Sequence, residues 1–314
     1  MDKRIILRWL HQKLFGPIWV KHPETIQLDT HNFCNLSCEY CNVQHSFNLP
    51  KGKMPLETVE YILKYFGKRL FYSIALFMNG EPMLDERLRQ MCSMAKQYCD
   101  TQCLIDTNGT IYENRKNLIH PNLKLVRFTI SAITPETYEK VHGKPYFDKA
   151  LATFNWFLKN RLPSQKPWLH FIACKDNEHE LEKWIQHFKG VGRTVFPVHR
   201  NPDFQLNSEA VLGSVIEKPF MLDENGKKKM LDSHPYLKPC PVWDIMAVSW
   251  DGRILQCCDM PYEFNYGRVG ETDLLEAWHQ RNRNMMDNNC CRDCKLKHVD
   301  AKRIFEKYLG LNRR

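Results

Sequence analysis

The sequence predicts an α/β protein with a parallel sheet, because six short apolar segments alternate with amphipathic helices between residues 25 and 200. Neighbouring strands that are joined by helices run parallel, since a parallel pair needs a long crossover connection. Such a sheet is either an open doubly wound sheet or an incomplete barrel, and hydrophobic periodicity does not distinguish the two. The six expected strands lie at residues 25–30, 72–80, 103–109, 124–131, 167–174 and 193–198.

Five segments between these strands carry apolar residues three and four positions apart, which is the spacing of a helix with one buried face. Pro55 stands near the start of the first segment, where its fixed φ and missing N–H are tolerated. The second and third strands end on turns at Gly80 and Gly109. The expected helices lie at residues 55–70, 85–99, 135–143, 146–160 and 178–190.

Three further segments flank this region. Residues 1–24 contain a short amphipathic helix at 4–15, which we expect to pack on the domain rather than lie on a membrane surface. Arg8, His11 and Lys13 interrupt its apolar run, so it fits neither an export signal nor a membrane span. Residues 201–239 are polar and lack a clear period, and we interpret them as a connecting or substrate-facing segment. Residues 240–314 form a cysteine-rich tail.

The composition argues against several classes of protein. Hydrophobic residues make up 43% of the 314 residues, enough for a real core, so wholesale disorder is not expected. The net charge of +9 is spread along the chain without a nucleic-acid-binding module, so nucleic acid is not an expected partner. Thirteen cysteines without an export signal indicate a cytoplasmic protein whose clustered thiols bind metal or react. The isolated cysteines that we expect in the core are Cys92, Cys99, Cys103 and Cys174.

Three cysteines, Cys34, Cys38 and Cys41, fall in the loop after the first expected strand. Three thiolates can hold a tetranuclear iron–sulfur cluster and leave one iron without a protein ligand, whereas a fourth would close the cluster. An open iron can bind a small molecule, by the logic that separates catalytic from structural zinc sites. Loops at the carboxyl ends of parallel strands are where α/β active sites are built. The alternative is a zinc knuckle with a distant fourth ligand, His31 or His45.

The Cys-x3-Cys-x2-Cys spacing in this loop resembles that of the radical S-adenosylmethionine (SAM) enzymes. Tyr40 matches the aromatic residue that this family often places before the last cysteine. The resemblance extends over about residues 25–300. It implies an α/β fold of the partial (β/α)6 barrel type over residues 25–200, with a [4Fe–4S] cluster that binds SAM on the three cysteines of the loop.

The same resemblance implies SAM contacts at the ends of the later strands. "MNGEP" at residues 78–82 is similar to the family's Gly-Gly-Glu-like stretch, although an asparagine replaces the first glycine. Glu81 would accept hydrogen bonds from the SAM ammonium, beside a glycine that permits close backbone approach. His142 stands where relatives often carry arginine, so Lys144 could supply the charge for the SAM carboxylate. The implied SAM-binding residues are Tyr40, Asn79, Gly80, Glu81, Asn108, Thr129 and Ser131.

The tail resembles the cysteine-rich extension called SPASM, or its shortened Twitch form, which holds one or two auxiliary clusters. A hairpin around residues 251–252 is expected to bring the first two ligands together, and a Cys-x2-Cys pair supplies the others. Four thiolates make one closed [4Fe–4S] cluster, which indicates the shortened form. Cys258 and Cys290 are alternatives within adjacent pairs, and a zinc ribbon fits this spacing nearly as well. The expected ligands are Cys240, Cys257, Cys291 and Cys294.

The resemblance implies a radical SAM oxidoreductase, or an enzyme that modifies a peptide or a small molecule. SAM is cleaved reductively to a 5′-deoxyadenosyl radical that abstracts hydrogen from a substrate carbon, and the auxiliary cluster accepts an electron. A flavodoxin- or ferredoxin-type protein is the expected reductant. About twenty-four residues precede the first strand, too few for a leader-recognition domain, which favours a small-molecule substrate or a peptide that a partner protein recruits. His199 and Asp203 border the expected mouth as surface residues, and no catalytic acid or base is identified.

Two alternatives come from other classes of protein. A zinc-binding interaction protein would keep both groups of cysteines but would have no use for a glutamate beside a three-thiol site. A non-catalytic iron–sulfur electron carrier would hold fully ligated clusters and would need no barrel.

Overall fold

The computed structural model of the 314-residue chain describes residues 21–41, 50–68, 73–197, 220–230, 243–258, 262 and 264–287. Among these residues, eleven strands form one sheet in the order β11-β10-β9-β1-β2-β3-β4-β5-β6-β7-β8. The strands are β1 (Thr25–Leu28), β2 (Ser73–Ala75), β3 (Gln102–Thr107), β4 (Leu123–Thr129), β5 (Lys166–Ala173), β6 (Gly192–Pro197), β7 (Phe220–Leu222), β8 (Lys228–Met230), β9 (Ile245–Val248), β10 (Arg253–Leu255) and β11 (Asn265–Arg268).

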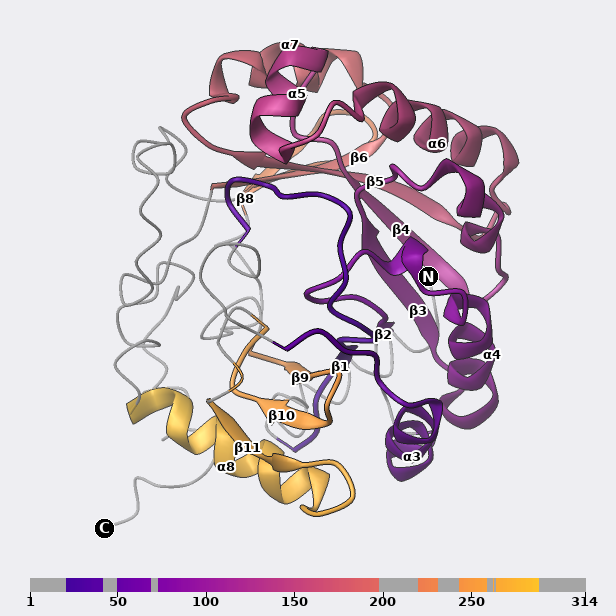
Figure 1. Ribbon diagram of the computed structural model, residues 1–314, viewed down its shortest axis with the longest axis vertical. Coiled ribbons are helices and arrows are strands. Elements are labelled where there is room, and N and C mark those ends of the chain that lie inside the picture. Colours follow the sequence, from indigo (N-terminus) through magenta and orange to yellow (C-terminus); the bar gives the residue numbers. More distant parts are fainter. Residues whose placement is uncertain are drawn as a thin grey trace.

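Strands β1 to β6 pair in parallel with their neighbours, which confirms all six expected strands and the parallel sheet. The sheet curves, and in the part of the chain that the structure describes its end strands β11 and β8 do not pair with each other (Figure 1). The fold is therefore a partial barrel and not an open doubly wound sheet. Hydrophobic periodicity did not distinguish these two possibilities.

Helices cover the outer side of the curved sheet (Figure 1). They begin and end close to the positions expected from the apolar spacing. The helices are α3 (Leu56–Phe66), α4 (Leu88–Cys99), α5 (Pro135–His142), α6 (Phe147–Asn160), α7 (Leu181–His187) and α8 (Leu274–Asp287), with short 3-10 helices η2 (Pro82–Leu84), η3 (Tyr112–Leu118) and η4 (Glu178–Glu180).

Aromatic side chains fill the layer between the sheet and the helices. Phe128 of β4 meets Phe154 of α6 edge to face, with ring centroids 5.2 Å apart. Phe171 of β5 meets Trp184 of α7 in the same way at 5.2 Å. Such pairs add about 0.5–1.5 kcal/mol to the stabilisation from burial alone. Because side chains alternate across a strand, the residues next to Phe128 and Phe171 face the concave side of the barrel.

The end of α5 is built to meet the cysteine loop. Thr134 caps the helix, since its hydroxyl accepts from the N–H of Thr137, and Pro135 is the first helical residue. Gly143 ends the helix with φ of +74° in the left-handed region. A Cβ on Gly143 would lie 2.3 Å from Ser37 Oγ. Glycine therefore allows both the helix end and the close approach of the loop.

The C-terminal extension continues the sheet of the barrel. Strand β9 pairs in parallel with β1, in register from Thr25 and Ile245 to Leu28 and Val248. Strands β10 and β11 then add in antiparallel fashion. The turn between β9 and β10 has Gly252 at φ +85°, and this confirms the expected hairpin.

Some features were not expected from the sequence. Strands β7 and β8 form an antiparallel hairpin at the far edge, within the polar segment that we interpreted as a connection. The 3-10 helix η3 also had no periodic signal. The expected helix at residues 4–15 lies outside the described residues. The four isolated cysteines are buried, as expected, and Cys174 lies just after β5.

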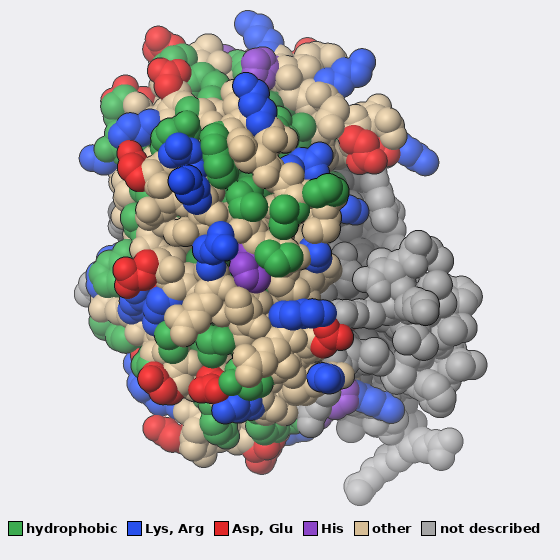
Figure 2. All heavy atoms as spheres, turned by 90° about the vertical axis from the view of Figure 1, so that its right-hand side faces the viewer, with side chains coloured by type: hydrophobic (Ala, Val, Ile, Leu, Met, Phe, Trp, Pro, Cys, Tyr) green, Lys and Arg blue, Asp and Glu red, His purple; other side chains and the backbone are tan. Residues whose placement is uncertain are grey.

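The outer face carries mixed charge. Figure 2 shows lysine and arginine side chains interspersed with acidic and apolar ones, without a single basic block. No helix among the described residues is both long and apolar enough to cross a bilayer.

Candidate active site

The cysteine loop follows β1, and backbone hydrogen bonds fix it to two neighbouring elements. The thiols of Cys34, Cys38 and Cys41 are partly buried, and the N–H of Cys41 donates to the carbonyl of Cys38 at 3.0 Å. One side of the loop is held by α5 and the other by the loop after β2. The anchoring bonds run from Ser37 N to His142 O (3.3 Å), Glu39 N to Val141 O (3.0 Å) and Glu81 N to Phe33 O (2.8 Å).

Burial makes the thiolate forms of Cys34 and Cys38 unfavourable without a cation. Burial, and then the nearby charges of Glu81 and Cys41, raise the pKa of Cys34 to about 11. Burial and the two other thiols raise the pKa of Cys38 well above its ordinary value. Metal coordination reverses this preference, because a coordinated thiol loses its proton.

The donor set fits an iron–sulfur cluster. One loop supplies three cysteine thiolates. Thiolates are soft ligands, and iron–sulfur clusters are held by such ligands. Among the residues that the structure describes, no three histidine, cysteine or carboxylate side chains converge as ligands of one metal ion. A tetranuclear cluster takes each thiolate at a different iron atom, so it has no need of such convergence.

Glu81 ties the end of β2 to the end of β3. Its carboxylate accepts from Thr107 Oγ1 at 2.5 Å, from Asn108 N at 2.7 Å and from Met83 N at 3.0 Å. It is buried, and burial raises its pKa to about 7 although these hydrogen bonds act in the opposite direction. The sequence analysis expected Glu81 to meet the SAM ammonium. The structure shows that Glu81 organises the loop, and its contact with the SAM ammonium remains a prediction.

Asn108 links the third strand to the cysteine loop. Its Nδ2 donates to Asn35 Oδ1 at 3.0 Å and lies 3.9 Å from Cys34 Sγ. Its Oδ1 accepts from the N–H of Thr110 at 2.9 Å. The structure thus brings Asn108 and the first cysteine together, at the mouth where the sequence placed them.

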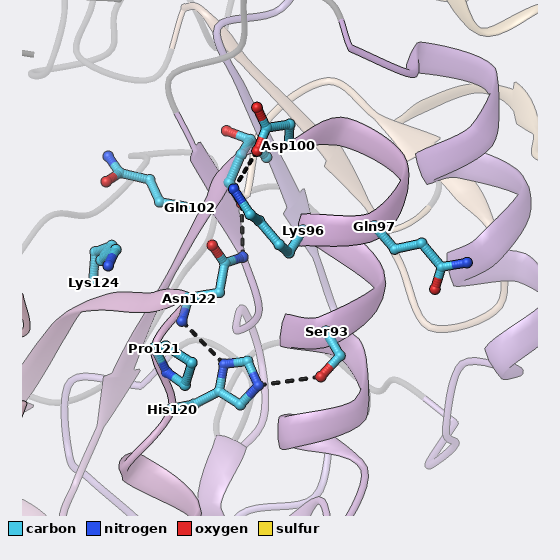
Figure 3. Close-up of a pocket in the computed structure, with 10 residues that line it drawn as sticks. Ser93, Lys96, Gln97, Asp100, Gln102, His120, Pro121, Asn122 and Lys124 are labelled. Atoms are coloured by element: carbon cyan, nitrogen blue, oxygen red, sulfur yellow. Dashed lines mark hydrogen bonds and ion pairs between the residues drawn. The ribbon is translucent and has the colours of Figure 1, made fainter.

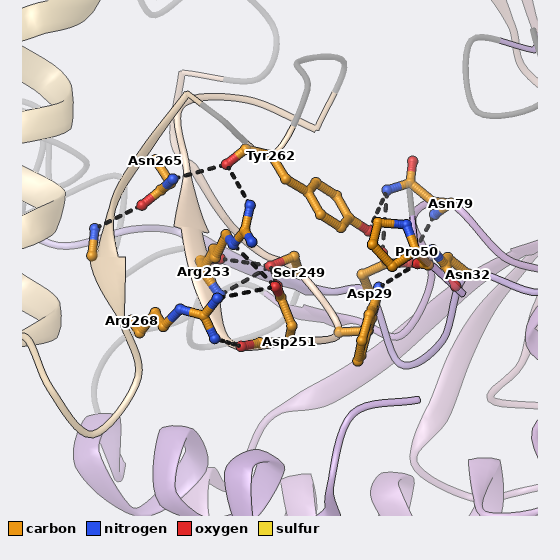
Figure 4. A network of polar contacts seen from close by, with 12 residues as sticks. Asp29, Asn32, Pro50, Asn79, Ser249, Asp251, Arg253, Tyr262, Asn265 and Arg268 are labelled. Atoms are coloured by element: carbon orange, nitrogen blue, oxygen red, sulfur yellow. Dashed lines mark hydrogen bonds and ion pairs between the residues drawn. The ribbon is translucent and has the colours of Figure 1, made fainter. Parts of the chain in front are cut away.

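Gly80 and Asn79 hold the loop after β2 against the cysteine loop. A Cβ on Gly80 would lie 2.2 Å from the carbonyl oxygen of His31, so glycine is required there by close packing. The backbone N–H of Asn79 donates to Asp29 Oδ1 at 3.0 Å. Its Nδ2 donates to Asp29 Oδ2 at 3.2 Å and contacts Tyr262 Oη at 3.1 Å (Figure 4).

This buried network joins the C-terminal extension to the barrel mouth. Asp29 follows β1, and Tyr262 comes from the extension and donates its hydroxyl to Asp29. Burial raises the pKa of Asp29 to about 6, and burial also raises the pKa of Tyr262. Sequence analysis missed both residues. The two residues are more than two hundred positions apart in the sequence, so no local sequence pattern predicts their contact.

The Asp29 carboxyl predicts a pH dependence of stability. Its pKa is about 6 in the folded protein against 3.8 ordinarily, so the stability it contributes is present at low pH and lost as pH rises through 6. Relative to Asp29→Asn, the wild-type free energy of unfolding should fall by roughly 2 kcal/mol between pH 4 and pH 7. Urea unfolding of both proteins across this range measures the difference. A pH-independent difference would contradict the assignment.

Thr129 and Ser131 occupy different environments. Thr129 is the half-buried last residue of β4, opposite His170 of β5. Ser131 is fully buried, and its hydroxyl accepts from the N–H of Ile172 at 3.0 Å. The structure therefore gives the Ser131 hydroxyl a role in joining β4 to β5, and its expected contact with the SAM ribose remains a prediction.

Tyr40 of the cysteine loop lies against His142, the last residue of α5. Tyr40 Oη is 3.4 Å from His142 Nδ1, and the rings meet edge to face with centroids 5.9 Å apart. His142 is fully buried, and burial lowers its pKa to about 3. It is therefore a neutral residue of the interior, unlike the exposed Lys144, which remains the candidate for a charge at the SAM carboxylate.

A polar cluster that the sequence analysis missed faces the concave side of the barrel. Asp106 of β3 forms an ion pair with Arg127 of β4, and His170 Nδ1 of β5 lies 3.6 Å from the other Asp106 oxygen. Burial raises the pKa of Asp106 to about 6 and, with the charge of Arg127, lowers that of His170. The available signal was the placement of polar residues between apolar ones in three successive strands.

The expected auxiliary ligands are described only in part. Cys257 lies just after β10, and both it and the neighbouring Cys258 are partly buried. The other expected ligands, Cys240, Cys291 and Cys294, and the alternative Cys290 lie outside the described residues, as do His45, His199 and Asp203.

A pocket lies at the opposite end of the parallel strands. It has a volume of 610 Å³ and sits where β3 and β4 begin, beside the end of α4 (Figure 3). Its lining includes Lys96, Lys124 and His120, and His120 Nε2 is 3.1 Å from Ser93 Oγ. It is separate from the cysteine loop, which follows the carboxyl end of β1.

An incomplete parallel barrel whose first strand leads into a three-thiol loop is the architecture of an enzyme that binds a metal cofactor at its mouth. The model of the Radical SAM superfamily matches residues 28–188, and that of SPASM, an iron–sulfur cluster-binding domain, matches residues 240–295. The chain belongs to the radical SAM superfamily and carries a C-terminal SPASM domain. These domains imply SAM, a SAM-binding [4Fe–4S] cluster and auxiliary iron–sulfur binding.

Individual proteins resemble the chain more distantly. A probable GTP 3′,8-cyclase of Saccharolobus islandicus is 23% identical over 261 residues, which cover 74% of this chain and 82% of that protein. Native anSMEcpe with bound AdoMet has a TM-score of 0.62 at 14% identity, over 91% of this chain and 97% of its own. Streptococcus suis SuiB bound to precursor peptide SuiA has a TM-score of 0.55 at 13% identity, over 94% of this chain and 73% of its own. These two structures show that the fold is shared.

Proposed function

We propose that the chain is a radical SAM oxidoreductase that removes a hydrogen atom from a substrate carbon and then oxidises the product radical. The observation that carries this proposal is the three-thiol loop, fixed against Glu81 and Asn108 at the carboxyl ends of β1 to β3. The SPASM domain supports the oxidative step, because an auxiliary cluster can accept an electron.

In this proposal Cys34, Cys38 and Cys41 hold the cluster. The bound cluster and SAM supply the chemistry, which is reductive cleavage of SAM to a 5′-deoxyadenosyl radical. Asn79, Gly80 and Glu81 form the stretch that receives the SAM amino group, and Glu81 also keeps that stretch in place. The remaining proposed SAM contacts are Tyr40, Asn108, Thr129 and Ser131.

For the auxiliary centre we propose one [4Fe–4S] cluster on Cys240, Cys257, Cys291 and Cys294. Four thiolates leave no open iron, which suits electron transfer rather than substrate binding. A flavodoxin- or ferredoxin-type protein is the proposed reductant. The auxiliary role is wrong if a folded Cys257→Ala protein that has lost this cluster oxidises substrate at the wild-type rate.

We infer that the cluster of Asp106, Arg127 and His170 binds a polar group of the substrate. These side chains lie on the concave face, and the Asp106 and Arg127 side chains are about a quarter exposed. They combine hydrogen-bond donors and acceptors, as a hydroxyl- or amide-bearing small molecule or peptide requires. Thr129 is one of the proposed SAM contacts, and it lies two residues after Arg127 on the same face of β4.

Arg127→Lys tests this inference. Lysine keeps the charge that pairs with Asp106 but loses the planar fork of donors. Substrate-dependent formation of 5′-deoxyadenosine should fall by on the order of tenfold, whereas substrate-independent formation stays the same. Lys124→Met, near the other end of β4, is the matched control and should change neither rate. Equal rates in the Arg127 variant and the control would overturn the inference.

Anaerobic reconstitution tests the function as a whole. We expect iron and sulfide in equal amounts and 5′-deoxyadenosine once SAM and a strong reductant are added. Zinc without sulfide would support a zinc-binding interaction protein instead. Clusters that assemble fully but never cleave SAM would support an electron carrier.

A second candidate function is radical cyclisation of a purine nucleotide. It is supported by the similarity to the protein named probable GTP 3′,8-cyclase, which extends over most of both chains. Incubation with GTP, SAM and reductant distinguishes the two candidates. GTP-dependent formation of 5′-deoxyadenosine with loss of GTP would favour cyclisation. Unchanged GTP would favour the oxidoreductase.

A further inference from the structure

His142 occupies a position from which its ring contacts one of the proposed cluster ligands. It is the last residue of α5, it is fully buried, and it stacks on Tyr138 with ring centroids 4.2 Å apart. Its Nδ1 is 3.3 Å from Cys38 Sγ. Its Nε2 is 3.2 Å from the backbone nitrogen of Ser131, which donates to it. Both ring nitrogens therefore have partners within the protein.

The Ser131 contact fixes the tautomer of the ring. A backbone N–H can only donate, so Nε2 must present its lone pair to Ser131. A neutral imidazole carries one proton, which is then on Nδ1. The Nδ1–H is aimed at the pair formed by Cys38 Sγ and Tyr40 Oη, at 3.3 and 3.4 Å. The ring is thus a donor beside the second cysteine of the loop.

We propose that His142 is a positioning residue that donates a hydrogen bond from Nδ1 to the Cys38 sulfur and so raises the reduction potential of the SAM-binding cluster. The inference rests on the proposed function, because it requires Cys38 to ligate the cluster. A donor to a ligand sulfur stabilises the negative charge that reduction adds, which makes the reduced cluster more accessible. The carbonyl of His142 also accepts from Ser37 N at 3.3 Å, so the same residue holds the loop in register with the ring.

The buried setting strengthens this effect. Tyr138 covers one face of the ring and Tyr40 meets its edge, which excludes water from the Nδ1–sulfur contact. A hydrogen bond to a charged acceptor is stronger where the local dielectric is low.

Redox titration followed by electron paramagnetic resonance tests the proposal. The signal is that of the cluster whose spectrum changes when SAM is added. His142→Phe keeps the stacked ring but removes the donor, and its midpoint potential should shift to a more negative value than in the wild type. His142→Asn places an amide N–H near the Nδ1 position, so its potential should lie closer to the wild type. Equal potentials in the phenylalanine variant and the wild type, with iron retained, would overturn the proposal.

A second measurement does not depend on the folding of a variant. Protein labelled with ¹⁵N in histidine should show a weak histidine nitrogen coupling to the reduced cluster in pulsed resonance spectra. Tyr40→Phe should keep this coupling. Its loss in that variant would mean that the coupling reaches the cluster through the tyrosine hydroxyl, and would overturn the direct Nδ1–sulfur contact. Absence of the coupling in the wild type would overturn the proposal. A wild-type protein that binds no cluster would instead refute the proposed function.

Discussion

Glu81→Ala is expected to unfold part of the barrel mouth and to abolish SAM cleavage. The substitution leaves the Thr107 hydroxyl and the backbone N–H groups of Met83 and Asn108 without their acceptor. Each buried donor left unsatisfied costs about 1–3 kcal/mol, so the loss of stability should reach several kcal/mol. The free energy of unfolding, the iron content and the yield of 5′-deoxyadenosine measure these effects.

Glu81→Gln is the comparison variant, because glutamine has nearly the same shape as glutamate. Its amide oxygen can replace Oε1 as the acceptor for Thr107 and Met83, but its NH2 group would then face the N–H of Asn108, which Oε2 now accepts. Its stability should therefore lie between those of the wild type and the alanine variant. An alanine variant with wild-type stability and wild-type cleavage would refute the role given to this carboxylate.

Cys34→Ala should lose the N-terminal cluster and all SAM cleavage, although the fold of the barrel should persist. Two thiolates from the loop leave two iron atoms without protein ligands, and such a cluster does not survive isolation. Iron and sulfide should fall by the content of one cluster, and the remaining signal should be insensitive to SAM. The Asn108 amide, 3.9 Å from this sulfur, should stay in place.

Cys92→Ala is the matched control for this variant. Cys92 is a buried residue of α4 in the hydrophobic core, so the substitution removes a sulfur atom without removing a proposed ligand. It should cost a modest amount of stability, on the order of 1 kcal/mol, and should keep both iron and activity. Retention of the N-terminal cluster in Cys34→Ala, or its loss in Cys92→Ala, would contradict the ligand assignment.

Most of the barrel could be predicted from the sequence because its strands bury apolar side chains on the face that the helices cover. Segments such as residues 124–131 and 167–174 are apolar runs between turns, and they became β4 and β5 with small shifts at their ends. The hairpin of β7 and β8 was missed because its strands are three residues long and lie in a polar segment without a clear period. The parallel pairing of β9 with β1 joins distant segments and has no local signature.

Some features of the candidate site could likewise be predicted from the sequence, and others could not. The cysteine loop, Glu81 and Asn108 lie in short motifs directly after strands, and the motifs could be identified in the sequence. The contact of Tyr262 with Asp29 joins residues from opposite ends of the chain. The Nδ1 contact of His142 with Cys38 depends on the angle at which α5 meets the loop. Such contacts follow from tertiary packing, and spacing along the sequence does not encode them.

The central claim is that the N-terminal cluster keeps one iron without a protein ligand, so that SAM can bind it. SAM labelled with ¹⁷O in its carboxylate and ¹⁵N in its amino group, added to the anaerobically reduced protein, tests this claim by electron–nuclear double resonance. We predict strong coupling of both labels to the N-terminal cluster, as direct coordination requires. A cluster that shows neither coupling, or whose fourth iron proves to carry a protein side chain in the presence of SAM, would contradict the account.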